Sequence, residues 1–185
     1  MGALLGFVAG LLTGGSLDNL LARRLRWPLV VVTAFAVKEL LIRTALGNLG
    51  LAPAIFAASL AVLITWTLWH FSQLPGIWLV ALGVGLNLVA VLANGGHMPV
   101  VPPAVHLGPP ELGQHGVWAQ YAIMDSGTRL RWLGDWILFP PPIDRLFPQA
   151  YSPGDLVSLL GVTLVLFLAT RPVPPAARQG AITTR

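Results

Sequence analysis

Six polar side chains in a strongly apolar chain are of types that could bind or act on a ligand. They are Asn87, Asn94, His97, Asp125, Arg129 and Asp135. If folding brought them together, they could act on a lipid headgroup. Four carboxylates of the same region could hold a hard cation such as Mg²⁺ or Ca²⁺ if they converged on one face, namely Asp125, Asp135, Asp144 and Asp155. The sequence contains no motif of a hydrolase or of a phosphate-binding loop. We therefore regard the six as a candidate polar site, assign no catalytic residue or metal to it, and leave any cofactor unknown.

The segment Asn94-Gly95-Gly96-His97-Met98-Pro99-Val100 stops an apolar run that begins at Gly76. Asn and Gly adopt the left-handed backbone angles that end helices, and the proline prevents the helix from resuming. The motif therefore predicts a helix end at a membrane surface. Helix termination does not require His97, and the two exposed glycine amides beside it could also bind an anionic group such as a lipid phosphate.

Two charged residues, Lys38 and Glu39, lie inside a predicted membrane helix, where an ionisable group suggests a function by default. Because they are adjacent, their side chains point about 100° apart and cannot simply face each other. We expect Glu39 to pair with Arg43 one turn later, or both residues to meet polar groups on neighbouring helices. A proton or ion pathway is the alternative. Asn87 and Asn94, two helical turns apart, predict a polar face that packs inward.

Several acids have ordinary structural roles available. Ser152, Pro153 and Asp155 have the pattern of a helix capping box with its favoured proline. Asp125 precedes Ser-Gly and is typical of a turn, and Thr128 is placed to cap a short helix that follows. These patterns predict that Asp155 and Asp125 stabilise local backbone structure.

Asp135 lies among aromatic and apolar residues, where an acid needs a partner. Arg129 and Arg131 are the nearest candidates, and we regard the two arginines as candidate partners of Asp135.

Three histidines recur every nine residues, at His97, His106 and His115, which is not a usual spacing of metal ligands. We therefore assign no metal site.

The composition indicates a membrane protein. Apolar residues make up 55% of the chain and charged residues only 10%, and the mean hydropathy is +0.74. The net charge of +4 does not indicate nucleic-acid binding, because the basic residues lie singly or beside apolar runs rather than in a stripe with aromatics. The chain has no cysteine, which excludes disulfides and thiol chemistry.

The apolar runs predict an all-α, polytopic membrane helix bundle. About five transmembrane helices are expected, the first of them short, at residues 2–17, 27–46, 51–71, 76–94 and 154–170. They form a single membrane domain, 1–171, followed by a flexible tail at 172–185. The long extracytoplasmic loop 95–153 is expected to carry one or two short interfacial helices between Val117 and Phe139, which end at the triple proline and cap the bundle.

Glycine recurs on every fourth residue of the first helix, at Gly2, Gly6, Gly10 and Gly14. Residues at this spacing share one helical face, along which another membrane helix can approach closely. The run is too short for an ordinary span and lacks the basic leader of a signal peptide. We predict a short, tightly packed first helix, and a re-entrant or interfacial segment is the alternative.

The arginines predict the orientation. Basic residues concentrate beside the start of the second helix and after the last one, at Arg23, Arg24, Arg26, Arg171, Arg178 and Arg185. Positive residues mark the cytoplasmic side of a membrane helix. The C-terminus is therefore expected in the cytoplasm and the loop 95–153 outside.

The polar motifs, in their order along the chain, resemble a known family. They are Leu86-Asn87, the Asn-Gly-Gly-x-Met-Pro-Val motif of 94–100, the segment 124–130, Leu133-Gly134-Asp135, and the Ser-x-Gly-Asp motif of 152–155. The chain resembles, over most of its length, a family of small bacterial integral membrane proteins. This family is classified as a domain of unknown function. It implies a bacterial plasma-membrane protein and supplies no activity. Lys38 and Glu39 lie outside its pattern.

Two classes of function follow from these observations. The first is a non-enzymatic assembly, packing or lipid-binding component, with membrane lipids and other membrane helices as partners and no nucleic acid. The second is a small membrane enzyme or carrier acting on a lipid headgroup or cation at the outer interface. The two are distinguished by whether Asn94, His97, Asp125, Arg129 and Asp135 converge in one pocket. We favour the first class.

Overall fold

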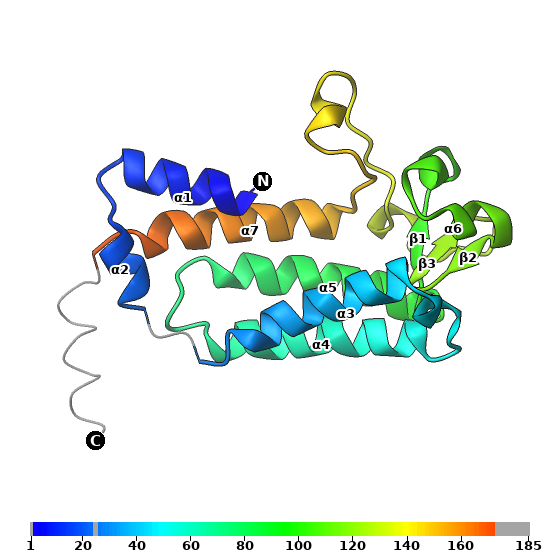
Figure 1. Ribbon diagram of the computed structural model, residues 1–185, viewed down its shortest axis with the longest axis horizontal. Helices are drawn as coiled ribbons and strands as arrows, with labels where there is room; N and C mark the ends of the chain where they lie inside the picture. The colour runs from blue at the N-terminus through cyan, green and yellow to red at the C-terminus, as the bar shows by residue number, and fades with distance from the viewer. Residues whose placement is uncertain (1, 24–25, 173–185) are drawn as a thin grey trace.

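A computed structural model describes residues 2–23 and 26–172 of the chain, so the tail expected at 172–185 lies almost entirely outside the described residues. The fold is mostly helical, as predicted (Figure 1). The principal helices are α1 (Gly2–Leu12), α3 (Leu29–Arg43), α4 (Ala52–Trp69), α5 (Ile77–Ala93) and α7 (Pro153–Ala169). Their long apolar stretches favour helices that bury faces against one another.

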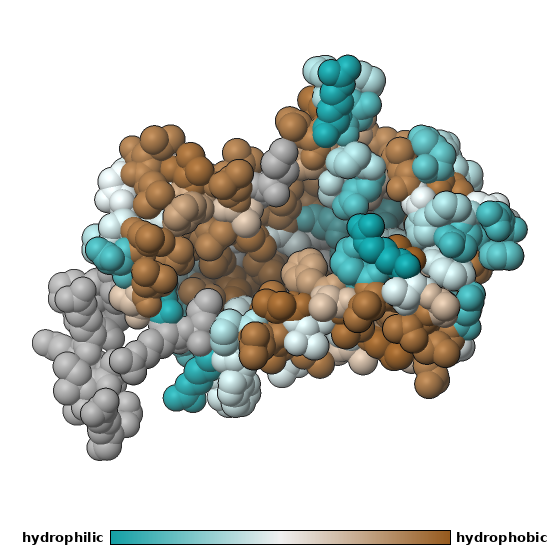
Figure 2. All heavy atoms as spheres, in the orientation of Figure 1, coloured by the Kyte–Doolittle hydropathy of each residue, from teal (hydrophilic) through white to brown (hydrophobic). Residues whose placement is uncertain are grey.

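The helices lie side by side in an order that differs from their order in the chain. The C-terminal helix α7 packs between α1 and α5, α4 packs on α5, and α3 packs on α4. Figure 2 shows hydrophobic residues over much of the helical part and hydrophilic residues gathered at the end that carries the long connection between α5 and α7. The last helix is therefore the central element that joins the N-terminal helix to the rest.

Glycines let α7 approach its neighbours closely. A Cβ added at Gly83 of α5 would overlap Ser158 and the Gly154 carbonyl of α7, and one added at Gly6 of α1 would overlap the Thr163 carbonyl. Gly10 faces α7 in the same way, whereas Gly14 has open space around it. Part of the predicted glycine stripe is thus occupied by a helix of the same chain.

The first helix is shorter than expected. It ends at Leu12 instead of continuing to residue 17, because Gly14 takes a positive φ of 90° and breaks the helix. A separate short helix, α2 (Leu17–Leu21), follows, and the Ser16 side chain caps it by accepting a hydrogen bond from the Asn19 amide.

The other helix limits lie closer to the sequence expectation. The expected helix 27–46 becomes α3 followed by a separate 3-10 turn, η1 (Ala45–Asn48), because Thr44 is extended and caps that turn. Helices α4, α5 and α7 begin and end within two residues of the runs expected at 51–71, 76–94 and 154–170. Of the described helices, α4 alone is both long and apolar enough to cross a membrane by length and composition, with 18 residues.

The long connection (residues 95–152) contains a small β-sheet, which corrects the all-α expectation. Strands β1 (Met98–Val100), β2 (Val117–Trp118) and β3 (Tyr121–Ile123) pair in the order β1-β3-β2. β1 and β3 are parallel, with Met98 opposite Tyr121, and β2 is antiparallel to β3. Short helices do occur in the connection, but two of them, η2 (Pro102–Leu107) and α6 (Pro110–His115), precede the segment 117–139 where they were expected.

The sheet and the helix ends share one buried core. Leu41 of α3, Phe56 of α4 and Val91 of α5 pack with Leu112 of α6 and Trp118 of β2. The Trp118 indole also donates a hydrogen bond to the Ile42 carbonyl at 3.0 Å. The connection is therefore fastened to the helices and is not a free loop.

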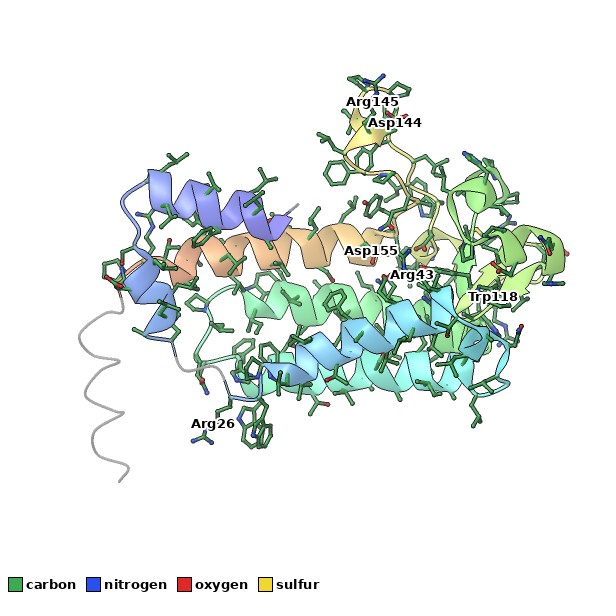
Figure 3. All side chains as sticks on the ribbon, viewed as in Figure 1. Arg26, Arg43, Trp118, Asp144, Arg145 and Asp155 are labelled. Atoms are coloured by element: carbon green, nitrogen blue, oxygen red, sulfur yellow. The ribbon has the colours of Figure 1, made fainter. Side chains whose placement is uncertain are left out.

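The rest of the connection returns the chain to α7. After the 3-10 turns η3 (Arg131–Leu133) and η4 (Ile143–Arg145), Phe139, Phe147 and Tyr151 stack on one another with ring centroids 5.0–5.8 Å apart. This hairpin projects from the side of the bundle in Figure 1, with Asp144 and Arg145 at its tip in Figure 3. The aromatic cluster closes its base.

Candidate functional site

A cavity of about 590 Å³ lies where α3, the start of α7 and the long connection meet. Figure 3 shows Arg43 at the end of α3 opposite Asp155 at the start of α7, and both line the cavity. Polar groups line it from several elements, namely Lys38, Glu39, Arg43, Glu111, Tyr121, Asp135, Gln149 and Asp155. A cavity of this size falls within the range of small-molecule sites.

Asp135 is the most unusual of these residues. It is only 8% exposed, and its Oδ1 atom has no hydrogen-bond partner among the described residues. The backbone holds it in place, because the Asp135 amide donates to the Pro99 carbonyl at 2.7 Å and its carbonyl accepts from Val101 at 3.0 Å. Burial raises the pKa of the Asp135 carboxyl well above its usual value, the charge of Asp155 raises it further, and Lys38 opposes the rise.

The expected pairing of Asp135 with an arginine is wrong. No salt bridge joins it to Arg129 or Arg131 in the described structure, and Lys38 is the cation that acts on it. The reason is that Asp135 forms a parallel β-bridge with Val100 at the edge of β1 and lines the cavity there. The two arginines lie earlier in the chain, in the turn before Asp135, and do not line the cavity. Sequence proximity therefore pointed to the wrong partner.

Lys38 lines the cavity from the last two turns of α3. Its side chain is half-buried, and no hydrogen bond or salt bridge joins its ammonium group to another residue that the structure describes. Its neighbour Glu39 does what was expected, pairing with Arg43 one turn later at 2.7 Å. This pair lies at the solvent-exposed rim of the cavity, with exposed fractions of 51% and 76%.

Tyr121 contributes a phenol from β3 to the same cavity. Burial raises the pKa of Tyr121, the Lys38 charge lowers it, and the carboxylates of Asp135 and Asp155 raise it further. The phenol therefore remains a neutral hydrogen-bonding group at physiological pH. The sequence analysis missed Tyr121, and the only available signal was its place in an aromatic segment.

Asp155 stabilises the floor of the cavity. The predicted capping box is confirmed, with Ser152 Oγ accepting from the Asp155 amide at 2.9 Å and Asp155 Oδ2 accepting from the Ser152 amide at 3.0 Å. Asn87 closes the network, since its Nδ2 donates to Asp155 Oδ1 and its Oδ1 accepts from Ser152 Oγ, both at 2.8 Å. Both carboxylate oxygens of Asp155 thus already have donors.

Asn94 and Arg129 form a structural link instead of a binding site. Asn94 ends α5, as the Asn-Gly-Gly motif predicted, and Gly95 and Gly96 follow with positive φ. The Asn94 amide group donates to the Arg129 carbonyl and accepts from the Arg129 backbone N–H, both at 2.9 Å. Asn87 and Asn94 therefore hold different parts of the chain to α5.

Asp125 organises a turn, as expected. Its Oδ1 accepts hydrogen bonds from the Gly127 amide at 2.9 Å and from the Thr128 hydroxyl at 3.1 Å. Thr128 does not cap the next helix, because its hydroxyl accepts from the Asp125 amide and η3 has no side-chain cap. Asp125 is exposed and does not line the cavity.

His97 lies in a second cavity, of about 430 Å³, which it shares with His115 and Trp118. Burial lowers the pKa of His97 below its usual value, against hydrogen bonds to the Asn94 and Gly95 backbone carbonyls that raise it. Within residues 2–23 and 26–172, no three metal-binding side chains come close enough to hold an ion. Of the six residues predicted to form a site, Asp135 alone lines the larger cavity.

Another buried polar group escaped the sequence analysis. The Gln120 side chain is fully buried, and the one polar group that it acts on among the described residues is the neighbouring Tyr121 phenol, whose pKa it lowers. It lies in the tight turn between β2 and β3, next to Ala119 with its positive φ of 50°. Gln120 lines neither cavity, so neither cavity explains why this side chain is buried.

The comparisons with known proteins support the family resemblance. Residues 23–167 match a family model described as Family of unknown function (DUF5317). No curated protein and no solved structure matches the chain significantly. The match covers 145 of the 185 residues and spans every residue that lines the larger cavity.

Proposed function

The chain belongs to this family of unknown function, and we propose that it is a non-enzymatic membrane protein that binds a lipid headgroup in the cavity. The observation that carries the proposal is a polar cavity at one end of an otherwise apolar helix bundle. A lipid places its headgroup at such a polar end and its acyl chains along the apolar helices.

Exposed apolar side chains support the placement in a membrane. Leu12 is 81% exposed and Leu29 72% exposed, and large apolar side chains are also exposed on α4 and α5. Only 22% of the apolar window of α4 is buried within the molecule. A soluble protein rarely leaves so much contiguous apolar surface uncovered.

The helix lengths are compatible with four spans and a short first helix. At 1.5 Å per residue, the 15 residues of α3 and the 17 residues of α5 and α7 reach about 23–26 Å, slightly less than a hydrocarbon core of about 30 Å. Local thinning and flanking residues can make up such a difference. The 11 residues of α1 reach about 17 Å and favour a helix that enters the bilayer without crossing it alone.

Basic groups at the opposite end support the proposed orientation. Arg23 donates hydrogen bonds to the carbonyls of Leu168 and Ala169 at the C-terminal end of α7, and Arg171 bonds Thr13 after α1. Basic residues concentrate on the cytoplasmic side of membrane proteins. We therefore place the cavity at the extracytoplasmic side of a bacterial plasma membrane.

The arrangement of the polar residues favours binding over catalysis. An enzyme at the outer interface was expected to gather Asn94, His97, Asp125, Arg129 and Asp135, yet these residues are divided among a helix-end link, a second cavity, a turn and the larger cavity. No nucleophile with an adjacent base is apparent among the residues that line the larger cavity.

Native mass spectrometry of the gently extracted protein tests the proposal. Gly108→Trp adds a bulky ring at the cavity wall, where Gly108 has ordinary space and an allowed backbone, and should abolish retention of lipid. Gly127→Trp, in the exposed turn, is the matched control and should retain lipid like the wild type. Equal retention by both variants would exclude the cavity as the lipid site.

Cysteine labelling tests the orientation, because the chain has no cysteine of its own. His115→Cys lies at the sheet end, and Ser72→Cys lies in the exposed turn between α4 and α5. A membrane-impermeant reagent should label only the His115 variant on intact cells. Labelling of both variants from outside would contradict the proposed topology.

A further inference from the structure

We infer that the cavity selects a zwitterionic headgroup that carries a phosphate and a primary ammonium group, with Lys38 holding the phosphate and Asp135 the ammonium group. The inference rests on the proposed lipid-binding function and adds the chemical class of the ligand. Neither side chain has a hydrogen-bond or salt-bridge partner that the described residues supply, and they share one cavity.

The unpaired carboxylate oxygen of Asp135 calls for a donor. Asp135 is more than nine-tenths buried, and backbone hydrogen bonds to Pro99 and Val101 hold its position in the fold. A buried acceptor without a donor is costly, and a charged donor compensates it best. A primary ammonium group supplies up to three N–H donors together with the opposite charge.

The ammonium group of Lys38 calls for an anion. The other acids at this end of the cavity are already engaged, since both oxygens of Asp155 accept hydrogen bonds and Glu39 pairs with Arg43. Lys38 therefore keeps its hydrogen-bonding capacity for a ligand, and an ammonium group is a common partner of phosphate.

The charge balance favours a ligand with both charges over one with a single charge. A bare anion would satisfy Lys38 but bring negative charge beside Asp135 and Asp155, and a bare cation would satisfy Asp135 but crowd Lys38. A zwitterion adds no net charge and meets both groups. Its tails can leave the cavity past Leu107, an exposed apolar residue of the lining.

The depth of the cavity floor also suits a headgroup. Asp155 is bonded to Asn87, which lies six residues before the end of α5, or about 9 Å along the helix. The charged floor is therefore recessed below the end of α5, beside the start of α7, so a headgroup must enter the cavity to reach it.

Competition between lipids tests the ligand class. Delipidated protein in neutral detergent is mixed with equal amounts of phosphatidylethanolamine, phosphatidylglycerol and phosphatidylcholine, and the bound lipids are counted by native mass spectrometry. We expect the wild type to retain phosphatidylethanolamine about tenfold over the other two, the ratio that one well-placed charged contact provides. Phosphatidylglycerol has no ammonium group, and the choline group has no N–H donor.

Two variants separate the roles of the two side chains. Asp135→Asn should reduce the preference for phosphatidylethanolamine about tenfold while phosphatidylglycerol binding persists, and Lys38→Gln should weaken both lipids. Asp18→Asn and Arg145→Gln, exposed residues outside the cavity lining, are the matched controls and should behave like the wild type. Circular dichroism checks that each variant remains folded.

The single lysine of the chain gives a second readout that does not depend on retention. Reductive methylation with ¹³C-formaldehyde before lipid is added leaves Lys38 as the one labelled side chain, beside the terminal amine. Its methyl signal should shift with phosphatidylethanolamine vesicles added to the reconstituted protein. A shift with soluble phosphoethanolamine alone would identify a free zwitterion, not the lipid, as the ligand.

The outcomes distinguish the two proposals. Lipid retention that Gly108→Trp abolishes, but that shows no preference among the three headgroups, would overturn the zwitterion inference and leave the lipid-binding function standing. Retention of phosphatidylglycerol over phosphatidylethanolamine would overturn the inference in the same way. Absence of any retained lipid, with an unmoved Lys38 signal, would overturn both.

Discussion

Replacing Ser152 by alanine should destabilise the protein more than an ordinary helix-cap substitution does. Ser152 is fully buried and has two partners, the Asp155 amide whose hydrogen bond it accepts and the Asn87 oxygen to which it donates. Loss of a capping side chain costs about 0.5–2 kcal/mol. The Asn87 oxygen would in addition lose its donor, at a cost of about 1–3 kcal/mol. The free energy of unfolding should therefore fall by about 1.5–5 kcal/mol.

Ser16→Ala provides the matched control. Ser16 also caps a helix, accepting a hydrogen bond from the Asn19 amide at 3.2 Å, but no other side chain of the described residues bonds to its hydroxyl. We expect this variant to lose no more than about 1 kcal/mol, because α2 is short and only partly buried. Both variants are measured by equilibrium unfolding in mixed micelles of a neutral detergent and dodecyl sulfate, followed by tryptophan fluorescence.

A double-mutant cycle isolates the interaction with Asn87. If the Asn87–Ser152 hydrogen bond contributes as the geometry suggests, the double variant should lose less stability than the sum of the single ones, by about 0.5–3 kcal/mol. Additive effects of Ser152→Ala and Asn87→Ala, or a Ser152→Ala effect no larger than that of Ser16→Ala, would refute the reasoning.

Three further perturbations address helix packing, the buried acid and the exposed ion pair. Gly83→Ala should lower the free energy of unfolding by about 1–3 kcal/mol, because a Cβ at this position would overlap α7. At Gly85 a Cβ would point into open space, so Gly85→Ala should be neutral or raise the free energy of unfolding by up to about 1 kcal/mol. Equal effects of the two variants in the unfolding titration would argue against close packing of α5 on α7. The folded-state pKa of Asp135 is raised, so its contribution to stability is complete below the ordinary value of 3.8 and is lost as pH rises through the raised pKa. Unfolding titrations that begin at the ordinary pKa and continue upward in pH should show this loss in the wild type relative to Asp135→Asn, and parallel pH profiles would contradict it. Glu39→Gln should leave the fold intact and cost less than about 0.5 kcal/mol, because its pair with Arg43 is exposed; a larger loss of stability would assign the pair a structural role that its exposure does not predict.

Features that depend on neighbouring residues were predictable. The helices α4, α5 and α7, the capping box at Ser152, the helix end at Asn94 and the Glu39–Arg43 pair all rest on interactions within a few residues. Each has a fixed spacing that the sequence displays directly. Where a local signal was misread, as for the first helix, a glycine with positive φ broke a run that was apolar throughout.

Features that join distant segments were not predictable in the same way. The sheet pairs β1 with β3 across more than 20 residues, and strands this short have too little periodicity to be told from interfacial helices. Arg129 and Arg131 lie within six residues of Asp135 in the sequence, which made them its nearest candidate partners. The fold forms no salt bridge between either arginine and Asp135. Pairing between distant segments depends on which segments bury one another, and the residues of one segment do not show which other segment covers it.

The sequence by itself determined that this is a mostly helical, apolar chain with polar motifs concentrated in one long connection, because composition and local spacing control helix formation and capping. Only the tertiary structure decided which polar groups meet. Lys38, Tyr121, Asp135 and Asp155 come from α3, β3, the edge of β1 and the start of α7, and they line one cavity because these elements pack there. The charges of a binding site depend on distances through space, and the fold alone sets those distances.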